Sequence, residues 1–183
     1  MITSQLEIIK QGQDYLSSIS AADYTAIISP NFISSAGEHV RHIIDHYLAI
    51  MVGIKSGTID YDVRSRGGKV EQDPAQAMEM MKTIAAWIKQ LSPNDLARTI
   101  PLSTEVSVSS KNVQTVITSV ARELIFSGSH AVHHYAMIAQ ITFAQQSNAV
   151  KVPTAFGVAP ATATFLREQA VQKQTALTAP VSN

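Results

Sequence analysis

The sequence predicts an all-α protein: a four-helix bundle followed by a short C-terminal helix. Apolar residues recur every three or four positions over four long stretches, which is the period of amphipathic helices. Helix-starting and helix-ending residues lie near the ends of several of these stretches. No internal repeat or linker divides the 183 residues, a length that suits one domain with a sizeable core. We therefore expect a single domain over residues 1–174 and a frayed tail over 175–183.

The first two helices are expected over residues 2–19 and from Ser35 to about Lys55. Ser35 and Glu38 have the spacing of a capping box, and Gly57 is placed to end the second helix. The apolar face of the first helix carries Ile2, Leu6, Ile9 and Leu16. The apolar face of the second carries Val40, Ile43, Ile44, Tyr47, Met51 and Ile54.

A polar connection leads to the third helix, in which Asp73 is the expected N-cap and Pro74 the first helical residue. This helix should bury Ala77, Met81, Ile84, Ile88 and Leu91. The segment "SPNDL" that follows should begin another helical turn. The alternation in "ARTIPLSTEVSV" then indicates short extended pieces or a hairpin.

The fourth helix is expected to be the longest, from about Lys111 to Gln146. Its apolar face is formed by Val113, Ile117, Val120, Leu124, Ala131, His134, Ile138 and Ile141. A short helix from Pro160 to about Lys173 should follow. Four long amphipathic helices with connections of mixed length are typical of a four-helix bundle.

The composition argues against several classes of function. The chain has 14 basic and 14 acidic residues, so no net charge attracts it to nucleic acid or anionic lipid. Cysteine is absent, which rules out disulfides, cysteine-ligated zinc and a cysteine nucleophile. The first residues do not resemble a signal peptide, and no apolar stretch approaches the ~20 residues of a membrane span. We expect a cytoplasmic protein that binds neither membrane nor nucleic acid.

All six histidines fall into two short segments about ninety residues apart along the chain. They are His39, His42 and His46 in "HVRHIIDH", and His130, His133 and His134 in "SHAVHHYAMIA". Histidines are common metal ligands, and two clusters on two long helices favour a metal site over scattered structural roles.

The second cluster contains an i, i+4 pair, His130 and His134, on one side of the fourth helix. This spacing lets two imidazoles reach one metal ion. His133 points away from that side, as a residue that either donates a hydrogen bond near the site or faces solvent. Glu123 lies two turns before His130 on the same side, where its carboxylate could orient a ligand histidine.

The first cluster should supply the third ligand. His39, His42 and His46 share a helical face within about 60°, bordering the apolar stripe. Helical geometry alone puts His39 and His46 nearest that stripe and leaves all three open as ligands. Three histidines and open coordination positions describe a catalytic type of metal site.

Four segments together resemble the DinB/YfiT-like superfamily over roughly residues 3–170. They are "SAGEHVRHIIDHYLAI", "IDYDVRSR", "SHAVHHYAMIA" and "VPTAFGVAPATATFLRE". The resemblance implies a bundle of up-down-down-up topology, often a homodimer, with a divalent metal, nickel or zinc. It implies His42, His130 and His134 as the ligands, with His46 in reserve, where helical geometry had favoured His39 or His46.

The resemblance also implies a class of activity. Members of the superfamily include S-transferases and isomerases that use a low-molecular-weight thiol, and metal-dependent hydrolases. We therefore expect a small-molecule substrate and either a thiol-dependent transferase or a hydrolase. In the "DYDVRSR" connection, Asp60, Asp62, Arg64 and Arg66 are candidates to line the substrate pocket and hold an anionic group. The alternative is a non-enzymatic metal-binding protein or a dimeric stress-response protein.

Overall fold

The computed structural model describes residues 1–145 and 150–178, with side chains through residue 174. The helices are α1 (Ile2–Leu16), α2 (Ala21–Thr25), α3 (Ala36–Ser56), α4 (Lys69–Gln72), α5 (Pro74–Gln90), α6 (Pro93–Ala97), α7 (Val120–Ala144) and α8 (Pro160–Thr178). The strands are β1 (Ile59–Asp60), β2 (Thr99–Glu105) and β3 (Val113–Ser119). The chain is mostly helical, as predicted, and also contains a small sheet.

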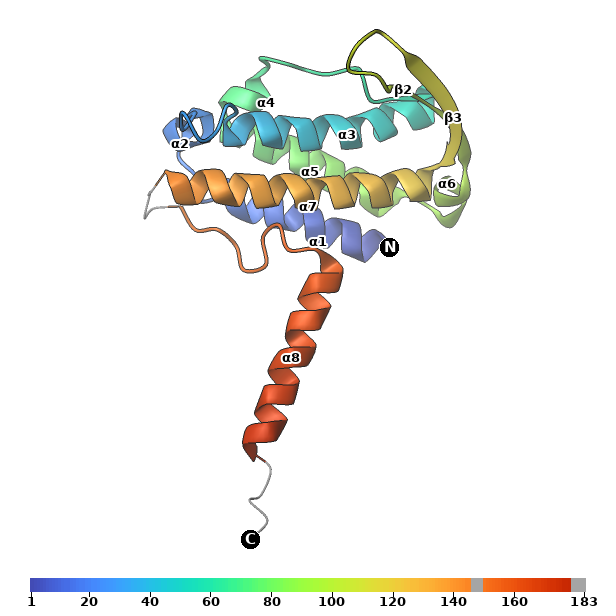
Figure 1. Ribbon diagram of the computed structural model, residues 1–183. Helices are drawn as coiled ribbons and strands as arrows, with labels where there is room; N and C mark the ends of the chain where they lie inside the picture. Colours follow the sequence, from blue (N-terminus) through green and yellow to red (C-terminus); the bar gives the residue numbers. More distant parts are fainter. Residues whose placement is uncertain (146–149, 179–183) are drawn as a thin grey trace.

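The long helices α1, α3, α5 and α7 pack side by side (Figure 1). Helix α3 contacts both α5 and α7, and α1 contacts the same two helices. The helices bury the apolar faces that the sequence indicates: Ile43 and Tyr47 of α3 and Ile84 of α5 are at most 1% exposed. Within the described residues, no helix is both long and apolar enough to cross a membrane.

Both predicted ends of α3 and the predicted start of α5 are confirmed. The Ser35 hydroxyl accepts a hydrogen bond from the Glu38 backbone N–H, and the Glu38 carboxylate accepts one from the Ser35 N–H. Gly57 closes α3 in the left-handed conformation, at φ 93°. At the start of α5, Asp73 caps the helix and Pro74 occupies its first turn.

The sheet corrects the prediction that one helix begins near Lys111. Strand β3 occupies residues 113–119, antiparallel to β2, and α7 begins only at Val120. Val113 and Ile117, expected on the buried face of that helix, are 44% and 68% exposed. The segment "VQTVITS" is rich in β-branched residues, which favour a strand, and its apolar spacing imitates a helical period.

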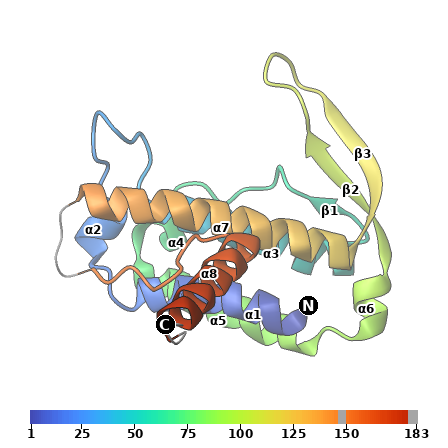
Figure 2. The ribbon, with the colours of Figure 1, turned by 60° about the horizontal axis from the view of Figure 1, so that its bottom comes forward.

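The pairing of the three strands joins the segment after α3 to the β2–β3 hairpin. Strand β2 lies in the middle of the sheet, antiparallel to β3 and parallel to β1, with Leu102 opposite Ile59. This pairing confirms the extended structure expected around residues 97–108. The β2–β3 hairpin extends away from the helices at one end (Figure 2).

The segment after α7 returns along the helices before α8 begins. Phe156 stacks between Tyr15 of α1 and Tyr135 of α7, with ring centroids 5.2 and 4.6 Å apart respectively. Helix α8 then leaves the body of the protein (Figure 1) and runs to Thr178, further than the expected end near Lys173. The expected end of the fourth helix at Gln146, and residues 179–183 of the expected tail, lie outside the described residues.

Candidate metal centre

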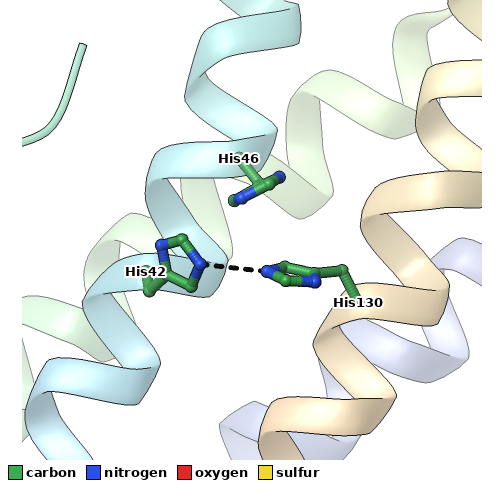
Figure 3. A group of neighbouring side chains, drawn as sticks. All are labelled: His42, His46 and His130. Carbon is green, nitrogen blue, oxygen red and sulfur yellow. Dashed lines mark hydrogen bonds between the residues drawn. The ribbon is translucent and has the colours of Figure 1, made fainter. Parts of the chain in front are cut away.

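Helices α3 and α7 lie side by side, and their contact brings the two histidine clusters together. His42 and His46 of α3 face His130 of α7 (Figure 3). One potential ligand atom from each of these three side chains lies within 4.8 Å of the other two. This group could hold a metal ion, because imidazole nitrogens at such separations can be drawn onto one centre.

His42, His130 and His134 form a second, overlapping set through their ring nitrogens. The Nε2 atom of His130 lies 2.9 Å from Nε2 of His42 and 3.1 Å from Nε2 of His134. The Nε2 atom of His130 thus contacts ring nitrogens of the same type on both helices. The sequence prediction of these three residues as neighbours is consistent with the geometry, but their role as ligands stays a prediction.

His46 lies beside the same pair on the opposite side from His134. Its ring centroid is 4.7 Å from that of His42 and 4.3 Å from that of His130. Its Nδ1 atom is buried and has no hydrogen-bond partner among the described residues. His42 and His130 are therefore common to two sets of three, one completed by His46 and the other by His134.

His39 is engaged by side chains on both of its ring nitrogens. Its Nδ1 atom lies 2.8 Å from Nδ1 of His134, and its Nε2 atom lies 2.9 Å from the Ser34 hydroxyl. Sequence reasoning left His39 open as a ligand. The contacts place it behind His134, where it can hold the orientation of that ring.

Burial keeps the histidines of the cluster neutral. Loss of hydration, followed by the effect of the neighbouring His130, lowers the pKa of His42 to about 4 and that of His46 to about 3. The pKa of His134 is lowered to about 3 for the same reasons. Burial also lowers the pKa values of His39 and His130. Neutral imidazoles have the free lone pair that binding to a metal requires.

Glu123 is fully buried and is bonded to residues other than the histidines. Its Oε2 atom accepts a hydrogen bond from the Tyr61 hydroxyl at 2.7 Å. Its Oε1 atom accepts from Thr118 at 2.6 Å and Arg122 at 2.7 Å. No hydrogen bond joins it to a histidine within the part of the chain that the structure describes. Its path to the cluster runs through Tyr61, because this ring stacks on His46 at a centroid distance of 4.6 Å.

The remaining predicted site residues, His133, Asp62, Arg64 and Arg66, are not part of either set of three histidines. His133 is exposed, and its ring centroid is 5.4 Å from that of His134. Asp62 accepts a hydrogen bond from the backbone N–H of Glu105, which ties its loop to the end of β2. Arg64 lines a cavity beside His42, His46 and His130, whereas Asp62 and Arg66 are not among the residues that line it.

Sequence reasoning missed three residues next to the cluster: Tyr61, Arg122 and Phe126. Phe126 lies one turn before His130 on α7, and its ring stacks on His130 at 5.7 Å. An aromatic residue four positions before a ligand candidate was the available signal for Phe126. Tyr61 carried no such signal, because its place beside the site depends on the pairing of the segment after α3 with the distant strand β2.

No protein-family model matches the sequence. FK506-binding protein 5 of Rhizopus delemar is 32% identical over 111 residues, which are 61% of this chain but only 28% of that protein. The chain thus spans little more than a quarter of this relative's length.

A separate comparison, with solved structures, matches most of the chain. The crystal structure of a DinB-like protein of Bacillus subtilis, YjoA, superimposes with a TM-score of 0.58 at 16% sequence identity. The match covers 82% of this chain and 94% of the other. At this identity the likeness concerns the fold. The chain therefore has the fold of the DinB-like proteins.

Proposed function

We propose that this protein is a metal-dependent enzyme of transferase or hydrolase type with a divalent metal ion, nickel or zinc, held by three histidines. The ligands are His42, His130 and His134, with His46 as the alternative third ligand. The observation that carries the proposal is the position of the His130 Nε2 atom, which lies 2.9 Å from Nε2 of His42 across the α3–α7 contact and 3.1 Å from Nε2 of His134 on its own helix.

The donor set fits such an ion. Imidazole nitrogens suit zinc and nickel, whereas magnesium and calcium require oxygen ligands. The group of His42, His46 and His130, whose potential ligand atoms lie within 4.8 Å of one another, contains only histidines, and so does the proposed set with His134. Their lowered pKa values keep them unprotonated at neutral pH, and the buried Nδ1 of His46 has no other partner among the described residues.

A divalent ion at this position supplies Lewis acidity, which lowers the pKa of a coordinated water or thiol. The chain contains no cysteine, so a reacting thiol would enter as a low-molecular-weight cofactor. The chain's own residues position the ligands. His39 orients His134, and the Tyr61–Glu123 hydrogen bond fixes the ring that packs on His46.

Metal analysis of the untagged protein tests the ligand set. We expect one equivalent of bound metal in the wild type and its loss in His42→Ala and His130→Ala. His134→Ala and His46→Ala distinguish the two candidates for the third ligand, since only the true ligand should abolish binding. His133→Ala is the matched control, because His133 is an exposed histidine on the same helix. Unchanged metal content in all four cluster variants contradicts the proposal.

A second candidate function is metal carriage without catalysis. It is favoured by the fourth imidazole, because His42, His46, His130 and His134 together could close a tetrahedral shell. Cobalt substitution separates the two functions. An enzyme site should change its visible spectrum when an external thiol such as 2-mercaptoethanol is added, and a closed site of four histidines should not. A screen of thiol–electrophile pairs and esters then distinguishes transferase from hydrolase.

We also propose the finer topology, an up-down-down-up bundle, and a cytoplasmic homodimer. The topology is supported by the chain directions in Figure 1, where α3 and α5 run one way and α1 and α7 the other. The pairwise contacts of the four long helices also support it. Size-exclusion chromatography with light scattering tests the dimer.

A further inference from the structure

A cavity of about 380 Å³ opens beside the histidine cluster. Three of the histidines, His42, His46 and His130, form one wall of it. The other walls are formed by Tyr61, Arg64, Leu102, Thr104, Arg122 and Phe126. Its volume lies in the range of cavities that hold small organic molecules.

Two guanidinium groups reach this cavity from different elements. Arg64 belongs to the loop between β1 and α4, and Arg122 belongs to the first turn of α7. Arg64 lines the cavity together with His42 and His46. Among the described residues, no ion pair or hydrogen bond involves its side chain. Arg64 therefore has its donors free for a ligand.

Arg122 already contacts two side chains of the protein. Its Nη1 atom donates to Glu123 at 2.7 Å, and its guanidinium lies over the Phe126 ring at 5.2 Å from the centroid. These contacts fix the group at the cavity wall, and its side chain remains 60% exposed. A guanidinium held in this way can use its remaining N–H groups on a ligand at little entropic cost.

The charges of these residues leave one uncompensated positive charge at the cavity. Arg64 and Arg122 contribute two positive charges, and the Glu123 carboxylate, which accepts from Arg122, contributes one negative charge. A singly charged carboxylate matches this balance, and its two oxygens fit the planar donors of arginine.

The remaining walls suit a flat apolar group. The Phe126 ring stacks on His130 with an interplanar angle of 17°, and Tyr61 lies 5.8 Å from Phe126 between centroids. Leu102, only 6% exposed, completes the apolar side. An aromatic or other flat ring can pack against such a surface while its carboxylate faces the arginines.

We propose that this cavity is the substrate subsite and that it binds a small aromatic or flat apolar carboxylate, whose anionic group is held by Arg64 and Arg122. That the occupant is the substrate rests on the proposed function, because the cavity opens onto the histidines. The binding itself depends only on residues of the chain and not on the metal.

Benzoate binding to the metal-free, full-length protein tests the subsite, measured by calorimetry or by ligand-observed NMR. Benzamide is the neutral comparison of the same shape. We expect benzoate to bind at least ten times more tightly than benzamide. Arg64→Gln and Arg122→Gln should each weaken benzoate binding about 10-fold to 100-fold, as expected for loss of a charge-assisted hydrogen bond. Lys69→Gln, which removes an exposed charge outside the cavity, should have little effect.

Four outcomes overturn the inference. The first two are equal affinity for benzoate and benzamide, and an equal loss of benzoate affinity in Lys69→Gln and Arg64→Gln. The others are tighter binding of phenyl phosphate than of benzoate, and benzoate binding that requires bound metal and is unchanged in both arginine variants. If Arg122→Gln does not fold because the Glu123 carboxylate loses its arginine partner, the benzoate affinity of Arg64→Gln alone tests the inference. Metal content separates the two proposals, since the arginine variants should keep wild-type metal. If the wild type binds benzoate but takes up no metal, the subsite is supported and the proposed metal function is refuted.

Discussion

His39 and His134 meet through their Nδ1 atoms, 2.8 Å apart, across the contact between α3 and α7. If Nε2 of His134 binds the metal, its Nδ1 must carry the proton and donate to His39. His39 then accepts on Nδ1, and its Nε2–H donates to the Ser34 hydroxyl 2.9 Å away. One arrangement of protons therefore satisfies both contacts and leaves the metal-facing nitrogen of His134 free.

This relationship predicts a graded effect of His39→Ala. The variant should keep one metal equivalent at saturating metal but lose about 10-fold to 100-fold in affinity, the usual effect of removing a residue that orients a ligand. Competition with a chelator of known affinity measures it. His134→Ala should behave differently and fail to saturate if His134 is a ligand. Equal affinity in His39→Ala and wild type would show that His39 does not orient the site.

The lowered histidine pKa values predict that the metal-free protein loses stability as pH falls. In the unfolded chain these histidines take up protons near pH 6.5, whereas folding holds the pKa of His42 at about 4 and those of His46 and His134 at about 3. Between pH 6.5 and 4 the unfolded state binds more protons, so the free energy of unfolding decreases with decreasing pH. Each histidine contributes at most about 1.4 kcal/mol per pH unit.

Urea unfolding of the metal-free protein at pH 7, 6 and 5 measures this dependence. His46→Gln should show a shallower dependence than the wild type, because His46 is a buried member of the group, at 7% exposure. A wild-type stability that is the same at pH 7 and pH 5 would contradict the lowered pKa values.

The buried Glu123 predicts a large stability cost for a conservative change. Glu123→Gln replaces one accepting oxygen with an N–H donor that faces Tyr61, Thr118 or Arg122, all of which donate to this carboxylate. We expect a loss of about 1–3 kcal/mol in the free energy of unfolding. Glu7→Gln, an exposed change on α1, should stay within about 0.5 kcal/mol of the wild type. Equal stability of the two variants would rule out the network as a stabilising element.

Replacing Gly157 by alanine should destabilise the protein through a steric collision. The same change at Gly67 measures the cost of backbone strain without that collision. Gly157 and Gly67 both have positive φ, at 73° and 68°. A Cβ atom at position 157 would collide with the backbone of Ala136 on α7, whereas one at position 67 would meet no atom within 4 Å. Gly67→Ala should cost about 1–2 kcal/mol, and Gly157→Ala clearly more. Thermal unfolding measures both, and equal losses would show that the segment can move away from α7.

Much of the fold was predictable because the helices carry local signals. The capping box at Ser35 and the Asp73–Pro74 start of α5 are contained in a few consecutive residues, and both are observed. The strand β3 was not predictable by period alone. Val113, Ile117 and Val120 fall at helical spacing, and only the pairing with β2, a contact between distant residues, decides for a strand.

The candidate site, too, was predictable from the sequence only in part. The i, i+4 pair of histidines on α7 follows from sequence spacing, and α3 was correctly expected to face it. The position of His39 behind His134 did not follow, because it depends on the exact rotation of α3 against α7. Arg122 was missed for a similar reason, since its role comes from a cavity built by a loop, a strand and a helix together.

The stacking of Phe156 between Tyr15 and Tyr135 has a consequence for any shortened version of this protein. A chain cut after α7 would keep every histidine and the helices α1, α3, α5 and α7, yet both tyrosine rings would lose the aromatic face that covers them. Such a fragment should expose apolar surface, unfold at lower temperature and aggregate. The smallest stable unit that carries the histidines must therefore extend past residue 156.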